Sequence, residues 1–72
     1  MAPYQERVIE EKKELDVKIE KLKTFSAVPG DVVYDGLPAE EKHRLARQLA
    51  LMLALSIVLG ERIEAFEENP NA

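Results

Sequence analysis

Few side chains in this 72-residue sequence could take part in catalysis. The chain has one histidine, His43, two serines, Ser26 and Ser56, and no cysteine. Covalent or acid-base catalysis needs a nucleophile beside a base, or two acid/base groups held together. We expect His43 to be an exposed helix residue and Ser56 to bond back to a carbonyl of its own helix. The sequence therefore predicts no catalytic residues and a protein that is not an enzyme.

Metal and cofactor sites are also not expected. Zinc needs a cluster of His and Cys ligands, and hard cations need several converging oxygens. The acidic pairs Glu11 with Glu14 and Glu40 with Glu41 lie on helix faces that nothing in the pattern encloses. No Gly-rich phosphate loop is present. We predict neither a metal nor a cofactor.

A nucleotide pocket built between subunits is a further option. An aromatic ring beside a cation can hold a nucleotide by base stacking and charge-assisted phosphate contacts. Tyr4 lies near the start of the first helical stretch, and Lys18 and Lys21 lie about four turns later. These residues cannot meet within one straight helix, but they could meet across an antiparallel pair of such helices.

Apolar periodicity predicts a first helix over residues of about 4–25. Its stripe consists of Tyr4, Val8, Leu15, Ile19, Leu22 and Phe25. Pro3 fits the first turn, and we interpret the charged residues on the other face as solvated. The segment "SAVPGDVVYDGLP" then predicts a Gly/Pro loop with room for one short turn around Val32 to Tyr34.

A second helix is predicted over about 38–68, with Pro38 in its first turn. A heptad seam runs along it through Leu45, Leu49, Met52, Ser56, Leu59, Ile63 and Phe66. The fold class is therefore all-α, with two antiparallel helices in a single small domain, 1–72. The polar end "ENPNA" predicts a disordered tail at about 69–72.

The segment "QLALMLALSIVLG", residues 48–60, is apolar on every side of the second helix. The first helix can bury only the seam, so another element must bury the remaining apolar residues, which are Leu51, Leu53, Leu55, Ile57 and Val58. With cysteine and zinc sites excluded, oligomerisation is the remaining way to stabilise so short a chain. We expect a homo-oligomer, in which Ala46, Ala50 and Ala54 would allow close helix approach.

Charge and hydropathy exclude several partners. The net charge is −4, whereas proteins that bind DNA, RNA or anionic membranes are normally basic. The apolar run is about 11 residues long, and a membrane span needs about 20. The N-terminal sequence lacks the apolar segment of a signal peptide. We expect a cytoplasmic protein with no nucleic-acid or membrane partner.

The order of motifs resembles the small phage proteins of the anti-CBASS cyclic-oligonucleotide sponge family. The first half carries Tyr-x-x-Arg-Val, Glu-Leu-x-x-Lys and Lys-Leu-x-x-Phe, and the second carries Arg-Leu-x-x-Gln, Met, Ser-x-Val-Leu and Arg-Ile-x-x-Phe. The matching residues are Tyr4, Arg7, Val8, Glu14, Leu15, Lys18, Leu22, Phe25, Arg44, Leu45, Gln48, Met52, Ser56, Leu59, Arg62, Ile63 and Phe66. The resemblance thus covers nearly the whole chain.

The resemblance implies a helical subunit with a kinked first helix, assembled into a homohexamer in the cytoplasm of the infected bacterial host. Family members sequester cyclic di- and trinucleotide messengers without cleaving them, which blocks activation of CBASS immune effectors. The implied ligand-binding residues are Tyr4, which stacks on a base, Lys18 from a neighbouring subunit, and Arg7 of the first motif. Arg62 is the candidate for a second site that takes cyclic trinucleotides.

Two features depart from the family pattern. Leu55 stands where relatives often have an aromatic residue, and the "SAVPGDVVYDG" loop is longer and richer in Gly and Pro. Both departures bear on ligand choice. The alternative hypothesis is a helical oligomeric adaptor with no small-molecule ligand, for which Val32, Val33 and Tyr34 would supply the contact surface.

Overall fold

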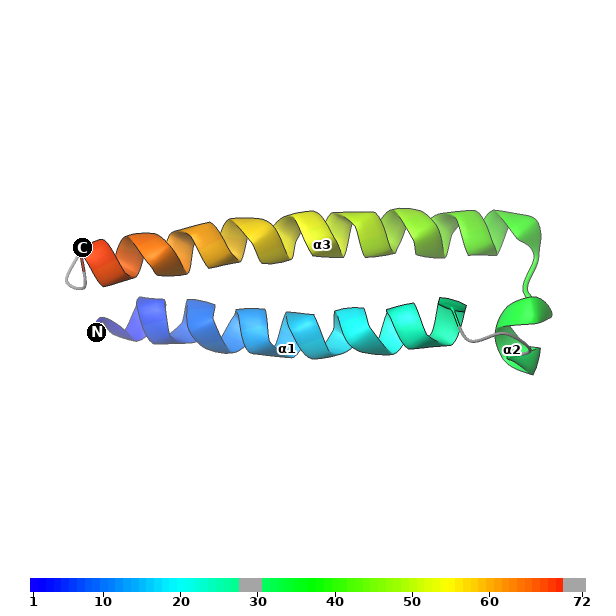
Figure 1. The fold of residues 1–72 in the computed structure, drawn as a ribbon, viewed down its shortest axis with the longest axis horizontal. Coiled ribbons are helices and arrows are strands. Elements are labelled where there is room, and N and C mark those ends of the chain that lie inside the picture. The colour runs from blue at the N-terminus through cyan, green and yellow to red at the C-terminus, as the bar shows by residue number, and fades with distance from the viewer. Residues whose placement is uncertain (28–30, 70–72) are drawn as a thin grey trace.

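The computed structural model of the chain is an antiparallel helical hairpin, which confirms the predicted all-α class (Figure 1). The structure describes residues 1–27 and 31–69. The hairpin measures 49 × 16 × 15 Å. The start of α1 and the end of α3 lie at one end of this rod, and α2 lies at the other.

The three helices agree closely with the predicted ranges. They are α1 (Pro3–Ala27), α2 (Val32–Asp35) and α3 (Ala39–Glu68). α1 is one continuous helix that Figure 1 shows without a sharp bend, so the kink implied by the resemblance is not found. The predicted tail falls largely on 70–72, outside the described residues, and Asn69 still caps α3 through its backbone N–H.

The helix ends have identifiable local causes. Asp31 caps α2, because its side chain accepts a hydrogen bond from the backbone N–H of Tyr34 at 2.9 Å. Pro38 occupies the N-cap of α3 in an extended conformation. Glu40 and Glu41 follow in the first turn, where the helix dipole favours negative charge.

The core lies along the predicted heptad seam. Val8, Leu59 and Phe66 form a buried cluster, and Leu15 and Ile63 pack against it. Every seam residue of α3 is buried or half-buried, so the seam prediction is confirmed. Among the described residues, a single row of contacts between α1 and α3 therefore supplies most of the tertiary structure.

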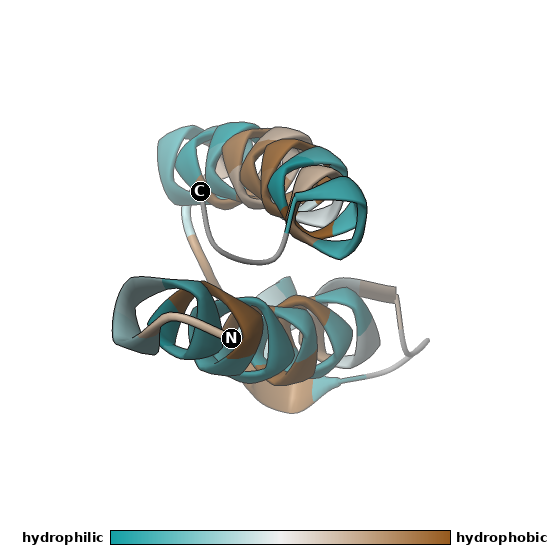
Figure 2. Ribbon diagram, turned by 90° about the vertical axis from the view of Figure 1, so that its left-hand side faces the viewer, coloured by the Kyte–Doolittle hydropathy of each residue, from teal (hydrophilic) through white to brown (hydrophobic). Residues whose placement is uncertain are grey.

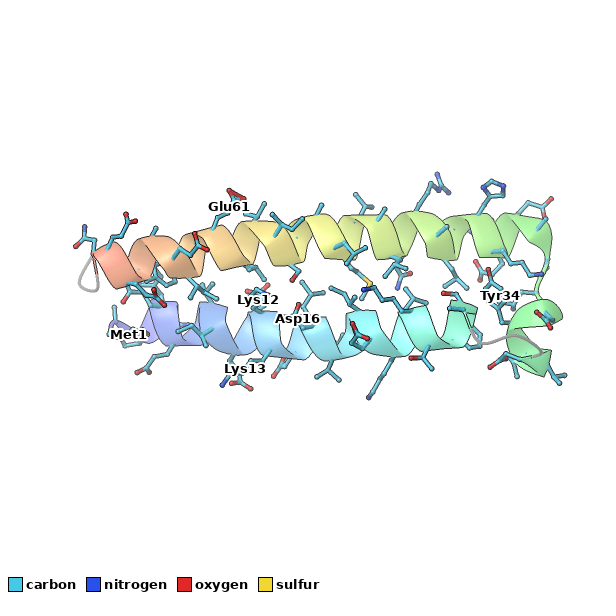
Figure 3. All side chains as sticks on the ribbon, viewed as in Figure 1. Met1, Lys12, Lys13, Asp16, Tyr34 and Glu61 are labelled. Atoms are coloured by element: carbon cyan, nitrogen blue, oxygen red, sulfur yellow. The ribbon has the colours of Figure 1, made fainter. Side chains whose placement is uncertain are left out.

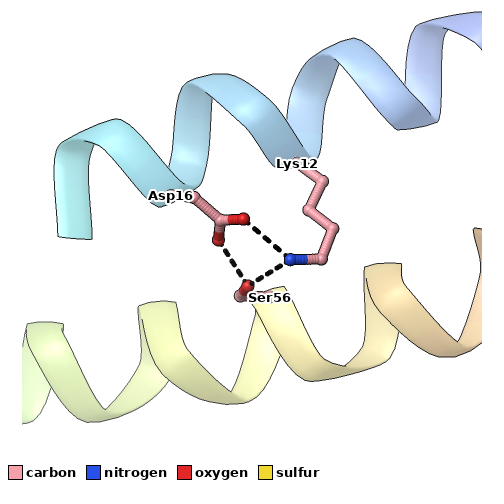
Figure 4. A network of polar contacts seen from close by, with 3 residues as sticks. All are labelled: Lys12, Asp16 and Ser56. Carbon is pink, nitrogen blue, oxygen red and sulfur yellow. Dashed lines mark hydrogen bonds and ion pairs between the residues drawn. The ribbon is translucent and has the colours of Figure 1, made fainter. Parts of the chain in front are cut away.

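A polar network interrupts this apolar seam at its middle (Figure 4). The Nζ of Lys12 donates to Asp16 Oδ2 at 2.7 Å and to Ser56 Oγ at 3.1 Å. The Ser56 hydroxyl donates to Asp16 Oδ1 at 2.6 Å. Ser56 thus bonds across the interface, and the expectation of a bond to its own helix was wrong, because α1 places a stronger, charged acceptor within reach.

The same network corrects the interpretation of the charged residues of α1 as solvated. Lys12 lies between the helices, and its Cε is 3.4 Å from the position that a Cβ on Gly60 would take. Gly60 thus leaves room for the aliphatic part of this lysine. Lys13, in contrast, points away from α3 (Figure 3).

Hydrogen bonds from Lys12 and Ser56 lower the pKa of Asp16 below its ordinary value of 3.8. A carboxylate whose pKa is lower in the folded state than in the unfolded state stabilises the fold at pH values above its unfolded-state pKa. This contribution is lost as the pH falls through the folded pKa. The network therefore stabilises the hairpin at neutral pH and fails in acid.

We predict that Asp16→Asn lowers the melting temperature at pH 7, because Lys12 loses its charged partner. The difference from the wild type should shrink below about pH 4, where the wild-type carboxylate also becomes protonated. Thermal unfolding followed by circular dichroism between neutral and acidic pH measures this. Glu20→Gln is the control, since Glu20 and Lys23 form only an exposed pair at 3.7 Å. A difference that stays constant with pH would contradict the role of Asp16.

One side of α3 packs on α1, and its other sides remain exposed. Leu51 is 71% and Ile57 66% exposed, and the remaining exposed large apolar residues of α3 are Leu53, Leu55 and Val58. Figure 2 shows the hydrophobic colour concentrated in the middle turns of α3. The expected second apolar face is therefore present, and one hairpin does not cover it.

We expect the protein to sediment as an assembly of several subunits at low micromolar concentration, because exposed apolar surface of this extent favours association in water. Analytical ultracentrifugation tests this expectation. A folded species of 8.2 kDa would contradict it.

Candidate functional site

Tyr4 lies at the open end of the hairpin, where α1 begins and α3 ends. Its ring packs edge-to-face on Phe66, with centroids 5.6 Å apart and planes at 84°. The tyrosine is still 39% exposed. One part of the ring is thus held by the core while another is accessible, which suits a stacking platform that must not move when it binds.

Gln5 fixes this end of the molecule, a role that was not predicted from the sequence. The residue is fully buried. Its Oε1 accepts a hydrogen bond from the backbone N–H of Ala2 at 2.9 Å, and its Nε2 donates to the carbonyl of Asn69 at 3.5 Å. Gln5 therefore ties the first turn of α1 to the last turn of α3 and positions its neighbour Tyr4. A glutamine near a helix start is the sequence signal that could have indicated it.

The other predicted ligand-binding residues are exposed and spread along the rod. Lys18 and Arg7 are exposed on α1, and Arg62 is exposed on α3. Lys18 lies about 21 Å along the helix axis from Tyr4, because the helix rises 1.5 Å per residue. The structure of one chain therefore does not bring Tyr4 and Lys18 together. Arg62 is one turn from Phe66, at the same end of the rod as Tyr4.

An open groove on the loop-side half of α3 was not predicted as a site. It has a volume of about 430 Å³ and is lined by Arg44, Arg47, Gln48, Leu51, Met52 and Leu55. Arg44 pairs with Glu41 at 2.9 Å, and Gln48 donates to the sulfur of Met52 at 3.8 Å. Arg47 has no ion pair with any described residue. None of the four predicted ligand-binding residues lines this groove.

The α2 end presents a different surface. Tyr34 is half-buried, with its ring edge-to-face on Phe25 at 5.5 Å and the Lys42 ammonium 5.2 Å from its centroid. Tyr34 therefore packs the hairpin end and is a poorer contact residue than the alternative hypothesis requires. Val32 and Val33 are 84% and 67% exposed. Only these two of the three adaptor residues lie fully at the surface.

Among the described residues, none of the side chains considered for catalysis hydrogen-bonds to another. His43 is exposed on α3, and the Ser26 hydroxyl donates to the carbonyl of Leu22 at 2.9 Å. Within residues 1–27 and 31–69, no three acidic or histidine side chains gather as a metal site would require. No helix among these residues is both long and apolar enough to span a membrane.

A family model matches most of the chain. The Sequestin family model matches residues 2–65. No curated protein and no solved structure matches the chain. The matched region includes α1, α2 and most of α3, and all four predicted ligand-binding residues lie within it. Since the match spans far more than half of the sequence, the chain belongs to the Sequestin family.

Proposed function

We propose that this protein is a phage anti-defence protein that binds and sequesters cyclic di- and trinucleotide messengers, and thereby blocks activation of bacterial CBASS effectors. The family match over residues 2–65 carries the proposal. It agrees with the resemblance to the sponge family and with a family name that denotes sequestration. The site of action would be the cytoplasm of the infected host.

The geometry of the hairpin supports a site shared between subunits. Tyr4 offers a ring braced by Phe66, and Lys18 offers an exposed ammonium about 21 Å away along α1. A second hairpin that runs antiparallel to the first would bring its Lys18 toward this ring. We propose a homohexamer as the assembly that completes such sites, with Arg7 adding charge beside Tyr4 and Arg62 serving a second site.

The proposed mechanism is stoichiometric capture. The base would stack on Tyr4, and the phosphates would accept charge-assisted hydrogen bonds from Lys18 and Arg7. These cations would offset the overall negative charge of the chain at the site, because nearby charges outweigh distant ones in a pocket. Tight binding and slow release then replace turnover.

We predict that Tyr4→Ala and Lys18→Ala each weaken binding of a cyclic dinucleotide. Loss of the stacking partner should cost about 1–3 kcal/mol, and loss of the charged contact about 1.5–3 kcal/mol. Isothermal titration calorimetry measures both effects, alongside a melting curve of each variant.

Two matched controls separate binding from folding. Tyr4→Phe keeps the ring and should retain most of the affinity, and Lys13→Ala removes an exposed lysine that points away from α3. The site lies elsewhere if affinity survives both test substitutions, or if it falls only in step with stability. The Arg44 and Arg47 groove would then be examined next.

We propose that the protein is not an enzyme and predict that bound cyclic nucleotide is recovered intact. Heat denaturation of the complex followed by chromatography and mass spectrometry should return the compound that was added. Linear products that form in proportion to protein would reveal an active site. A protein-free sample heated in the same way is the control.

The second candidate function is a helical adaptor without a small-molecule ligand. Exposed Val32 and Val33 at the α2 end favour it, because adjacent apolar residues at a rod's tip suit a protein contact. Thermal unfolding with a panel of cyclic di- and trinucleotides separates the two functions. A ligand at 100 times its dissociation constant adds about 2.7 kcal/mol to stability. No shift with any compound would favour the adaptor.

A further inference from the structure

The side of α3 that faces away from α1 carries a second heptad stripe, which we call the outer stripe. Its residues follow one another in alternating steps of four and three, and all are exposed: His43, Arg47, Ala50, Ala54, Ile57, Glu61, Glu64 and Glu68. Figure 3 shows Glu61 on the side of α3 away from α1. The outer stripe is basic where α3 begins, small and apolar at its middle, and acidic where α3 ends.

We propose that a second copy of this chain packs on the outer stripe, with the two α3 helices antiparallel and related by a two-fold axis at Ala54. Arg47 and Glu61 lie equally far from Ala54 along the helix. The two-fold axis therefore places Arg47 of each subunit beside Glu61 of the other. It also brings His43 within one residue of the level of Glu64, and Ile57 to the level of Leu51, of the partner subunit.

Charge determines this orientation. An in-register parallel pair would place Arg47 against Arg47 and Glu61 against Glu61, which costs energy, whereas the antiparallel pair joins opposite charges at both ends. None of Arg47, Glu61 and Glu64 forms an ion pair with another residue among 1–27 and 31–69, so the charged ends are not already satisfied within the hairpin.

Side-chain size supports the same contact. Ala50 and Ala54 lack bulk at the centre of the stripe, so two helix backbones can approach closely there. Ile57 and Leu51 are among the most exposed apolar residues of α3, and they flank this centre. An isologous interface that is apolar at its core and charged at its rim is the usual form of a homodimer contact.

Charge reversal tests both the contact and its orientation. We expect Arg47→Glu and Glu61→Arg each to weaken self-association about tenfold, because each substitution removes two equivalent ion pairs in a two-fold symmetric dimer. The double variant should associate about as tightly as the wild type. Sedimentation velocity over a dilution series measures the association, and circular dichroism checks that each variant is helical.

Lys13→Glu is the matched control, since Lys13 is exposed on α1 and points away from α3. It should leave association unchanged. The proposal is overturned if the wild type is a monomer, if the single reversals have no effect, or if the double variant is no better than the single ones. Assembly is measured without ligand, so this outcome is independent of whether the protein binds cyclic nucleotides.

A cross-link provides a second, structural readout. The chain has no cysteine, so Ala54→Cys introduces a single thiol. A residue on the two-fold axis meets its own copy within the Cα separation that a disulfide allows, about 4.4–6.8 Å. We expect near-complete disulfide dimer on mild oxidation. Val17→Cys, exposed on α1, should not form a disulfide cross-link in the same assay. Equal cross-linking of the two variants would overturn the contact.

Discussion

The structure depends on one imbalance: α3 has more apolar surface than the rest of a single chain can bury. α3 is apolar nearly all round over its middle turns, but α1 is a single amphipathic helix that covers one stripe. The core of a hairpin is then only the Val8, Leu59 and Phe66 cluster with its neighbours. Such a row buries little surface for a chain of this length, so we expect assembly and folding to be coupled.

The polar network in the seam has a different role from the apolar contacts beside it. Leucines along two antiparallel helices can slip in register at modest cost, but Ser56 of α3 bonds to both Lys12 and Asp16 of α1 in only one register. A slip would keep the Lys12–Asp16 ion pair, which lies within α1, but it would break both bonds to Ser56 and leave the serine hydroxyl in the seam without a partner. The bonds to Ser56 therefore favour the alignment in which Tyr4 packs on Phe66 near the open end of the hairpin. The position of the candidate stacking ring follows from an interaction several turns away.

Much of the fold could be predicted from periodicity, and most of the polar detail could not. The heptad steps from Leu45 to Phe66 identify the seam, and Pro38 and the Gly/Pro loop mark the helix ends. The network was missed because Lys12 and Asp16 interrupt the apolar stripe of α1, so the pattern assigns them to the solvated face. Gln5 was missed for the same reason. A polar residue in a seam is recognisable only when its partner on the facing helix is known, and this requires the register.

The candidate site was even less predictable from periodicity than the polar network. Periodicity places Tyr4 in the apolar stripe and does not choose between Lys18 and Lys21. The ligand-binding roles of Tyr4, Arg7 and Lys18 therefore rest on the resemblance, because an exposed residue of a charged helix has no periodic signal of its own. In the structure they lie along one rod, where a helix has no concave surface to gather them. A rod with separated binding groups can enclose a ligand only when a second rod supplies the opposite wall. Ligand affinity and subunit association are then linked, since each ligand that contacts two subunits also holds them together. A protein that acts by capture would gain from this linkage, because the proposed assembly would bury the apolar surface of α3 and complete the pockets at the same time.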